Sequence, residues 1–316
     1  MKTQMNIPFL SEEMLMELDI TTDDVVQSIE KFIAGSAKAT VWNAPKAVIL
    51  PPDGRYMMAA LAASDDPDLL VVKTVVLNPD NPNQGLPQIN GLVTILNSKT
   101  GLPVAIMDAN WITAVRTAGL SAVAAKHMAN KDAAVAAFVG CGVQAQSHLK
   151  AFSDMFPIEE IKVFGRGKAT IDSFCQYADS LNIRTQVCNT GNDAISDADL
   201  VVTSVTYSAQ LTPFLDANVL KPGSFTTVTD LSAPWIKPSF SAFDQITIDD
   251  LEQEAALPNK LVAIELVTGD LSGLVLGKFK GRNETDDRTA FIFRGHALGD
   301  LALSALAWQK ADESGI

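Results

Sequence analysis

The chain has 316 residues, 47% of them hydrophobic and 19% charged, which predicts one large or two ordinary domains with packed cores and excludes a disordered chain. Its formal net charge is −13 and it has no block of basic residues, which excludes nucleic acid and anionic membranes as its main partners. The first residues lack the apolar core of a signal peptide and no apolar run reaches membrane-spanning length, so we expect a cytoplasmic protein.

The first 130 residues predict an α+β domain. An amphipathic helix is expected at 22–33, with Thr21 or Thr22 as its N-cap. Strands joined by turns of Pro, Gly, Asn and Asp follow, and no helix long enough for a parallel crossover separates them, so a meander or hairpins are expected. The strands are predicted at 46–50, 56–62, 69–76 and 92–97, and Asp108 begins a long helix at 109–128.

From residue 131 onward, strand-like and helix-like segments alternate. This alternation predicts an α/β fold, a Rossmann-type doubly wound parallel sheet with helices on both faces, which binds ligands at the carboxyl ends of its strands. An apolar helix at 298–310 returns to the first domain, so we expect domains of 1–116 plus 299–316 and of 117–298. Strands are predicted at 135–139, 161–164, 185–188, 200–205, 225–228 and 245–248, and helices at 144–155, 168–182 and 194–198.

Cysteine and histidine usage limits the chemistry. The three cysteines are an odd number and form no C-x-x-C pair, so we expect reduced thiols rather than a disulfide framework. The three histidines are widely spaced and match no metal-ligand pattern, so no metal site is expected.

The predicted strand at 135–139 runs into Gly140-Cys141-Gly142-Val143-Gln144-Ala145, a G-x-G-x-x-A pattern at the start of a helix. Gly140 permits the tight turn, Gly142 leaves room for a pyrophosphate, and Ala145 lets the helix pack on the strand. The helix N-terminus offers free N–H groups and a positive dipole end to phosphates. The pattern predicts a dinucleotide site, and a glycine-rich turn without a ligand is the alternative.

The end of the second strand of this domain, Phe164-Gly165-Arg166-Gly167-Lys168, indicates which dinucleotide is bound. NAD sites usually carry an acidic residue here, which binds the ribose 2′-hydroxyl. This segment has no acid, whereas Arg166 and Lys168 are suited to a 2′-phosphate. The sequence therefore predicts NADP(H) in preference to NAD(H), which would serve less efficiently. The alternative is that both cations are ordinary solvated surface charges.

Three charged residues stand where chemistry is expected. Lys73 lies inside the apolar strand at 69–76, so it either reaches a partner or cleft, because burying an unpaired ammonium is costly, or faces solvent on an edge strand. Arg116 is in mid-helix among small residues that would let a ligand approach. Asp230 follows the strand at 225–228, the end where such a sheet places its chemistry, unless it only caps a turn.

The segment Arg116-Thr117-Ala118-Gly119-Leu120-Ser121-Ala122, followed by the glycine loop, resembles the ornithine cyclodeaminase/μ-crystallin family, and the resemblance covers almost the whole chain. Lys73 resembles the strand lysine of that family, and Asp230 resembles its aspartate after a nucleotide-domain strand. The closing segment Gly295-His296-Ala297-Leu298-Gly299-Asp300 resembles the family's G-x-x-x-x-D pattern.

The resemblance implies a two-domain NAD(P)-dependent enzyme, commonly a homodimer, that acts on a small imino or amino acid through a substrate-binding and dimerisation domain. It implies that Lys46, Lys73 and Arg116 hold the substrate carboxylate and that Asp230 and Lys73 are catalytic. Many members have an arginine in place of Lys46, so the planar fork is lost here although the charge is kept. The implied cofactor contacts are Arg116, Thr117, Gly140, Gly142, Val143, Gln144, Arg166, Lys168 and Ser204.

Two departures from the family pattern indicate the reaction. Residues 55–59 contain no acid where cyclodeaminases carry a glutamate for the substrate amine, and residues 231–235 lack their glycine-lysine pair. Both differences favour a reductase of cyclic imines. The resemblance then implies reduction of Δ1-pyrroline-2-carboxylate, and also of Δ1-piperideine-2-carboxylate, to L-proline and L-pipecolate, in proline metabolism and hydroxyproline degradation. The alternatives are ornithine cyclodeaminase, alanine dehydrogenase and a non-catalytic binding protein similar to the μ-crystallins.

Overall fold

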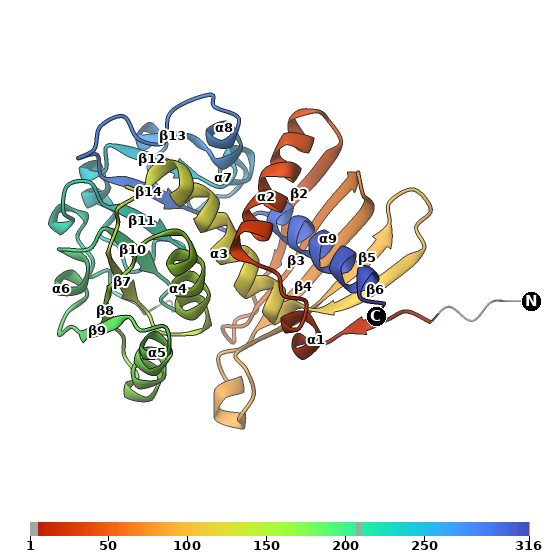
Figure 1. The fold of residues 1–316 in the computed structure, drawn as a ribbon, viewed down its shortest axis with the longest axis horizontal. Coiled ribbons are helices and arrows are strands. Elements are labelled where there is room, and N and C mark those ends of the chain that lie inside the picture. Colours follow the sequence, from red (N-terminus) through yellow and green to blue (C-terminus); the bar gives the residue numbers. More distant parts are fainter. Residues whose placement is uncertain (1–5, 207–209, 316) are drawn as a thin grey trace, which may run out of the picture. The chain divides into compact units, whose positions relative to one another are not determined.

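The computed structural model describes residues 6–206 and 210–315, and the chain divides into two compact units (Figure 1). Unit 1 contains the described residues up to Arg116 and those from Ala297 onward, and unit 2 contains those from Thr117 to His296. The first boundary falls within helix α3 (Ala109–Met128), and the second falls at the start of helix α9 (Ala297–Glu313).

Unit 1 is built on a six-stranded sheet in the order β1-β6-β5-β4-β3-β2. Strands β2 to β6 form an antiparallel meander, as predicted for β2 to β5, and the short β1 pairs in parallel with β6. Strand β6 was not predicted, because it is short and begins with a proline, which donates no ladder hydrogen bond. The strands are β1 (Phe9–Leu10), β2 (Val41–Ile49), β3 (Tyr56–Asp65), β4 (Asp68–Leu77), β5 (Ile89–Asn97) and β6 (Pro103–Asp108).

Two long helices cover one face of this sheet. Helices α2 (Thr22–Ala37) and α9 pack on each other, and α9 lies over β2, β3 and β4 (Figure 1). Helix α2 starts with a capping box between Thr21 and Asp24 and continues past the predicted end to Ala37. A one-turn helix, α1 (Glu12–Met16), precedes it, and the 3₁₀ turn η1 (Asn81–Gln84) lies between β4 and β5.

The strands of unit 1 alternate between the helix-covered face and an open face. On β4 the buried residues are Leu69, Val71, Lys73 and Val75, while Thr74 and Val76 between and after them are exposed. Lys73 therefore belongs to the covered face, and the edge-strand alternative is wrong, since β4 lies between β3 and β5.

Unit 2 is an eight-stranded sheet in the order β13-β12-β14-β11-β10-β7-β8-β9, and all of its strand pairs are parallel. This confirms the predicted α/β class, a doubly wound parallel sheet accompanied by an α+β domain. The strands are β7 (Val135–Val139), β8 (Glu160–Phe164), β9 (Arg184–Val187), β10 (Leu200–Thr203), β11 (Phe225–Val228), β12 (Gln245–Ile248), β13 (Val267–Asp270) and β14 (Thr289–Ile292).

The predicted helices of unit 2 are present, one of them displaced, and α7 and α8 were not predicted. The helix expected at 194–198 covers Gly191–Ile195 as α6, because the Thr190 side chain accepts the Asp193 N–H at 3.1 Å and so caps an earlier start. The other elements are α4 (Val143–Met155), α5 (Lys168–Ser180), α7 (Leu251–Ala256), α8 (Leu271–Val275), and the 3₁₀ turns η2 (Ala217–Val219), η3 (Lys237–Ala242) and η4 (Ile264–Leu266).

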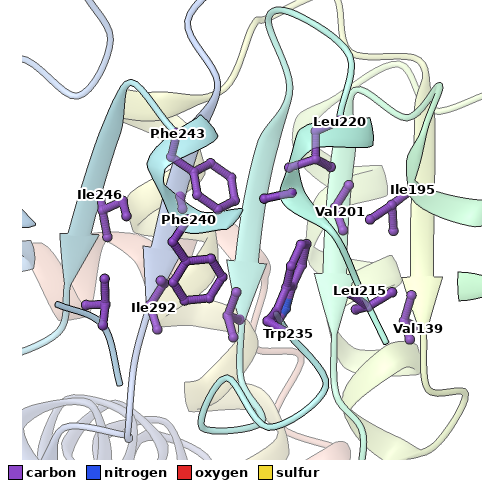
Figure 2. Close-up of a cluster of buried hydrophobic side chains, with 14 of the residues drawn as sticks. Val139, Ile195, Val201, Leu215, Leu220, Trp235, Phe240, Phe243, Ile246 and Ile292 are labelled. Carbon is purple, nitrogen blue, oxygen red and sulfur yellow. The ribbon is translucent and has the colours of Figure 1, made fainter. Parts of the chain in front are cut away.

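The connections between strands supply much of the core on one face of this sheet. Figure 2 shows Trp235 and Phe240 from the β11–β12 connection lying over residues of the central strands, such as Val201 and Ile292. The Trp235 and Phe240 rings are 5.9 Å apart and fully buried. Because this packing fixes the β11–β12 connection, it also fixes the start of that connection, where Asp230 lies.

The described residues show neither a membrane-spanning helix nor a metal-binding cluster. None of the helices in the described ranges has both the length and the apolar character needed to cross a bilayer. The same ranges contain no group of three or more His, Cys, Asp or Glu side chains placed to hold a metal ion.

Candidate functional site

The glycine loop has the geometry that its sequence predicts. Gly140 follows β7 with φ at +98°, and a Cβ there would lie 2.7 Å from the Ser204 carbonyl oxygen, so a side chain is excluded. Gly142 is the N-cap of α4, and a Cβ there would meet nothing within 4 Å. Ala145 is buried where α4 packs on the sheet.

This loop fits the phosphates of a dinucleotide. The open space at Gly142 lies at the N-terminus of α4, a helix of 13 residues, whose first N–H groups have no partner within the helix. The Ser204 hydroxyl and the Gln144 side-chain oxygen are buried without hydrogen-bond partners among the described residues. The structure thus places Gly140, Gly142, Gln144 and Ser204 together, with the exposed Val143 beside them.

The two cations after β8 differ in their surroundings. Both are exposed, but the Lys168 ammonium lies 2.7 Å from Asp172, one helical turn along α5. Arg166 forms no ion pair with any described residue. The Lys168–Asp172 pair follows the i, i+4 rule and was readable from the sequence. Arg166 is therefore the cation that is better placed to bind a phosphate.

Asp230 lies at the same edge of the sheet as this loop. It follows β11, Ser204 follows β10 and Gly140 follows β7, and these three strands are consecutive in the sheet, so their carboxyl ends meet. Thr117, in α3, is buried and belongs to the same unit. The order of the strands therefore brings the predicted acid and the predicted dinucleotide loop to one edge.

The Asp230 carboxyl is buried, and one of its oxygens is unsatisfied. Oδ2 accepts the Val205 N–H at 3.1 Å, while Oδ1 is buried and has no hydrogen-bond partner among the described residues. Burial raises the pKa of Asp230 to about 7, and hydrogen bonds from Val205 and Thr203 oppose that rise only partly. A carboxyl of this kind can hold or release a proton near neutral pH.

The turn after Asp230 is strained. Leu231 and Ser232 have φ values of 57° and 60°, in the left-handed region that residues with side chains rarely adopt. Such strain is retained where surrounding packing imposes it, which here is the anchoring of Trp235 in the core.

The cations predicted to bind a carboxylate lie in unit 1. The Lys73 ammonium, from β4, donates to Asp300 Oδ1 at 2.6 Å and to Thr113 Oγ1 at 3.2 Å. Arg116, on α3, places Nε 3.0 Å from the same Asp300 oxygen. Lys46 lies at an irregularity in the β2–β3 pairing and acts electrostatically on both Lys73 and Asp300.

This cluster shows a residue that sequence reasoning missed as part of the site. Asp300 stood out only as the end of the closing motif, and its contact with Lys73 spans 227 positions in the chain. Burial, together with the nearby Arg116, lowers the pKa of Lys73 to about 7 against the opposing effect of Asp300. Burial alone would raise the pKa of Asp300, but Lys73 and Arg116 hold it below its usual value.

The eight-stranded parallel sheet with its glycine loop at a carboxyl edge defines unit 2 as a Rossmann-type dinucleotide-binding fold. The chain belongs to the ornithine cyclodeaminase/mu-crystallin family, whose sequence model matches residues 8–315.

Similar proteins agree with this assignment. A Δ1-pyrroline-2-carboxylate reductase of Bacillus thuringiensis subsp. konkukian is 28% identical over 261 residues, which cover 79% of each chain. A solved structure of a Δ1-pyrroline-2-carboxylate reductase from Thermococcus litoralis is a complex with NADH and L-proline. It matches with a TM-score of 0.90 at 24% identity and covers 98% of this chain and 99% of that one. The two proteins therefore share a fold. An archaeal alanine dehydrogenase dimer with bound NAD has a TM-score of 0.86 at 25% identity, covering 99% of this chain and 98% of that one.

Proposed function

We propose that this protein is an NAD(P)H-dependent oxidoreductase that acts on CH–NH bonds and reduces the cyclic imine Δ1-pyrroline-2-carboxylate to L-proline. The six-membered Δ1-piperideine-2-carboxylate is a second substrate, because one extra methylene changes binding in an apolar pocket by only about 1–3 kcal/mol. The observation that carries the proposal is the buried Asp230 carboxyl, with a pKa of about 7, at the strand edge that also holds the dinucleotide loop.

Reduction of an imine needs a hydride at carbon and a proton at nitrogen. The bound dinucleotide supplies the hydride. Asp230 supplies or shares the proton through Oδ1, because Oδ2 is held by the Val205 amide and Oδ1 has no partner among the described residues. The imine carbon becomes electrophilic when the nitrogen is protonated, so a group that titrates near neutral pH suits this step.

The substrate carboxylate belongs with the cations of unit 1. The buried Lys73 and Arg116 share one carboxylate oxygen, that of Asp300, and two buried cations on one such partner favour an anionic ligand. Arg116 Nη1 is buried and has no hydrogen-bond partner among the described residues, so one donor remains for a carboxylate. Holding this group would orient the ring for hydride transfer.

The dinucleotide would be held by the glycine loop and α4 at its phosphates, by Ser204 beyond β10, and by Thr117 and Arg116 of α3. NADP(H) is preferred to NAD(H), because Arg166 forms no ion pair with a described residue and no acid follows β8 to bind a 2′-hydroxyl. The alanine dehydrogenase of the same fold binds NAD, so NAD(H) should serve as a weaker cofactor.

The active form is proposed to be a homodimer. On the face of the unit 1 sheet away from α2 and α9, the exposed large apolar side chains include Trp42, Leu61, Val76 and Leu92. A second copy of this sheet is the proposed occupant, since the archaeal relative that covers 99% of this chain is a dimer.

The decisive experiment compares three reactions with purified protein. Loss of NADPH or NADH absorbance with Δ1-pyrroline-2-carboxylate, without ammonia release, is the expected result. Ammonia and proline formed from ornithine with NAD⁺ would assign a cyclodeaminase instead. Pyruvate reduction that requires ammonia would assign an alanine dehydrogenase, and nucleotide binding without turnover of any of these substrates would indicate a binding protein.

A further inference from the structure

The closing G-x-x-x-x-D segment places an acid where a helix is otherwise apolar. Asp300 is in the first turn of α9, next to the buried Leu298 and Leu301, and is itself 1% exposed. A buried carboxylate is costly unless it is paired, so its partners indicate its role.

Two close partners of Asp300 are cations of the proposed carboxylate site. One oxygen, Oδ1, lies 2.6 Å from Lys73 Nζ and 3.0 Å from Arg116 Nε. The side chains of Lys73, Arg116 and Asp300 are 0%, 7% and 2% exposed. The contact with Arg116 is an ion pair without hydrogen-bond alignment, since Nε has no aligned partner. One carboxylate oxygen thus bridges two cations that would otherwise repel each other.

The bridge leaves donors of both cations uncommitted. The Lys73 ammonium has three N–H groups, of which Asp300 and Thr113 take two. Arg116 Nη1 is buried without a partner among the described residues. A substrate carboxylate has two oxygens and can accept from both cations at once.

We propose that Asp300 is a positioning residue that holds Lys73 and Arg116 side by side, each with a donor left for the substrate carboxylate. This inference rests on the proposed function, because it assigns the cluster to a carboxylate substrate.

The charge on Lys73 depends on pH, so the affinity for a carboxylate should depend on pH as well. The charged groups that act on Lys73 are Arg116 on α3, Asp300 on α9 and Lys46 on β2, and Asp300 alone among them favours the protonated form. As pH rises through about 7, Lys73 loses its proton and the site loses one positive charge, so carboxylate binding weakens. Replacing Asp300 with a neutral residue moves this loss to lower pH.

The test uses Asp300→Asn, which keeps the shape and removes the charge, and titrates pyrrole-2-carboxylate, an unreactive carboxylate of the same ring size, by calorimetry from pH 5.5 to 9. We expect the wild-type affinity to fall above about pH 7, and the Asp300→Asn affinity to fall at a pH about one unit lower, with about fivefold weaker binding at pH 7. In steady-state assays KM for the imine should rise far more than kcat falls. Asp154→Asn, which breaks an exposed pair with Lys150, should change neither.

A second variant covers the case in which Asp300→Asn does not fold. Lys73→Arg keeps a charge that does not titrate below about pH 12, so in a protein that also carries Asp230→Asn, which removes the other group that titrates near pH 7, binding should be independent of pH between 6 and 9. A wild-type affinity that is flat with pH, or an Asp300→Asn protein that is less heat-stable but binds pyrrole-2-carboxylate with unchanged affinity and pH dependence, overturns the inference. Shifted pH-dependent binding without imine turnover would refute the proposed function and leave the role of Asp300 intact.

Discussion

The Val205 amide donates to Oδ2 of Asp230 at 3.1 Å, and this bond joins the residues that follow two neighbouring strands, β10 and β11. It fixes one oxygen of a buried carboxyl and leaves Oδ1 without a partner among the described residues. A carboxyl held in this way has a defined direction for proton transfer. Its pKa of about 7 would let it act as an acid or as a base near neutral pH.

Asp230→Asn should keep the Val205 contact and remove the titratable proton. We expect kcat for imine reduction to fall by roughly 10²–10⁴-fold, the range for loss of a general acid, while the Kd for NADPH changes less than about twofold. Stopped-flow hydride transfer and fluorescence titration measure the two quantities. Asp197→Asn, at an exposed side chain, is the matched control. Strong residual turnover in Asp230→Asn would remove Asp230 from the mechanism.

The same substitution should change how stability depends on pH. The folded-state pKa of Asp230, about 7, lies above the reference value of 3.8, so its protonated form stabilises the fold below about pH 4, and this contribution is lost as pH rises through 7. Asparagine has no such titration. Relative to wild type, Asp230→Asn should therefore gain up to about 4 kcal/mol of unfolding free energy between pH 4 and 8. Urea unfolding at several pH values tests this, and parallel stability curves would contradict it.

The parts of the fold that could be predicted from the sequence are those with a local sequence pattern. The glycine loop could be predicted because a strand, a turn and a helix each have their own sequence pattern. Lys73 could be identified because it interrupts an apolar strand. Strand β14 lies between β11 and β12 and was not predicted, although it has four residues, as the predicted β11 and β12 do. Its place in the sheet depends on a crossover that no local pattern records.

The pairing of Lys73 with Asp300 could not be predicted either, because it too has no local sequence pattern. The alternation of β4 shows that Lys73 is buried, but nothing local connects it with Asp300, 227 positions away. At Lys168 a local signal was overlooked: it was grouped with Arg166 although Asp172 stands four residues later on the same helix. Local charge spacing was sufficient to separate these two cations.

Arg166→Ala should raise KM for NADPH more than about tenfold and KM for NADH less than about twofold, because only NADPH carries the 2′-phosphate that the guanidinium would bind. Lys168→Ala is the matched variant on the next turn, and since Lys168 pairs with Asp172 it should change both KM values little. Equal changes for the two cofactors in Arg166→Ala would mean that Arg166 does not recognise the 2′-phosphate.

Leu61→Glu should turn the proposed dimer into a monomer. Leu61 is 42% exposed on the face of the unit 1 sheet away from the helices, where a second copy would bury it, and a carboxylate there would be desolvated without a partner. Light scattering after gel filtration measures the mass. Val187→Glu, at an exposed position of β9 in unit 2, should leave the mass unchanged. A wild-type monomer at micromolar concentration would contradict the proposal.

Replacing each of the two loop glycines with alanine should affect a different property: stability at Gly140 and NADPH binding at Gly142. At Gly140, with φ at +98°, the new Cβ would lie 2.7 Å from the Ser204 backbone oxygen, so Gly140→Ala should lower the unfolding free energy by at least about 1–3 kcal/mol. At Gly142 the Cβ meets nothing within 4 Å, so Gly142→Ala should change stability by only about 0.5 kcal/mol. That same open space is where the pyrophosphate is expected, so Gly142→Ala should weaken NADPH binding at least about tenfold. Urea unfolding and fluorescence titration separate the two effects. A Gly142→Ala protein that binds NADPH as tightly as wild type would show that the phosphates lie elsewhere.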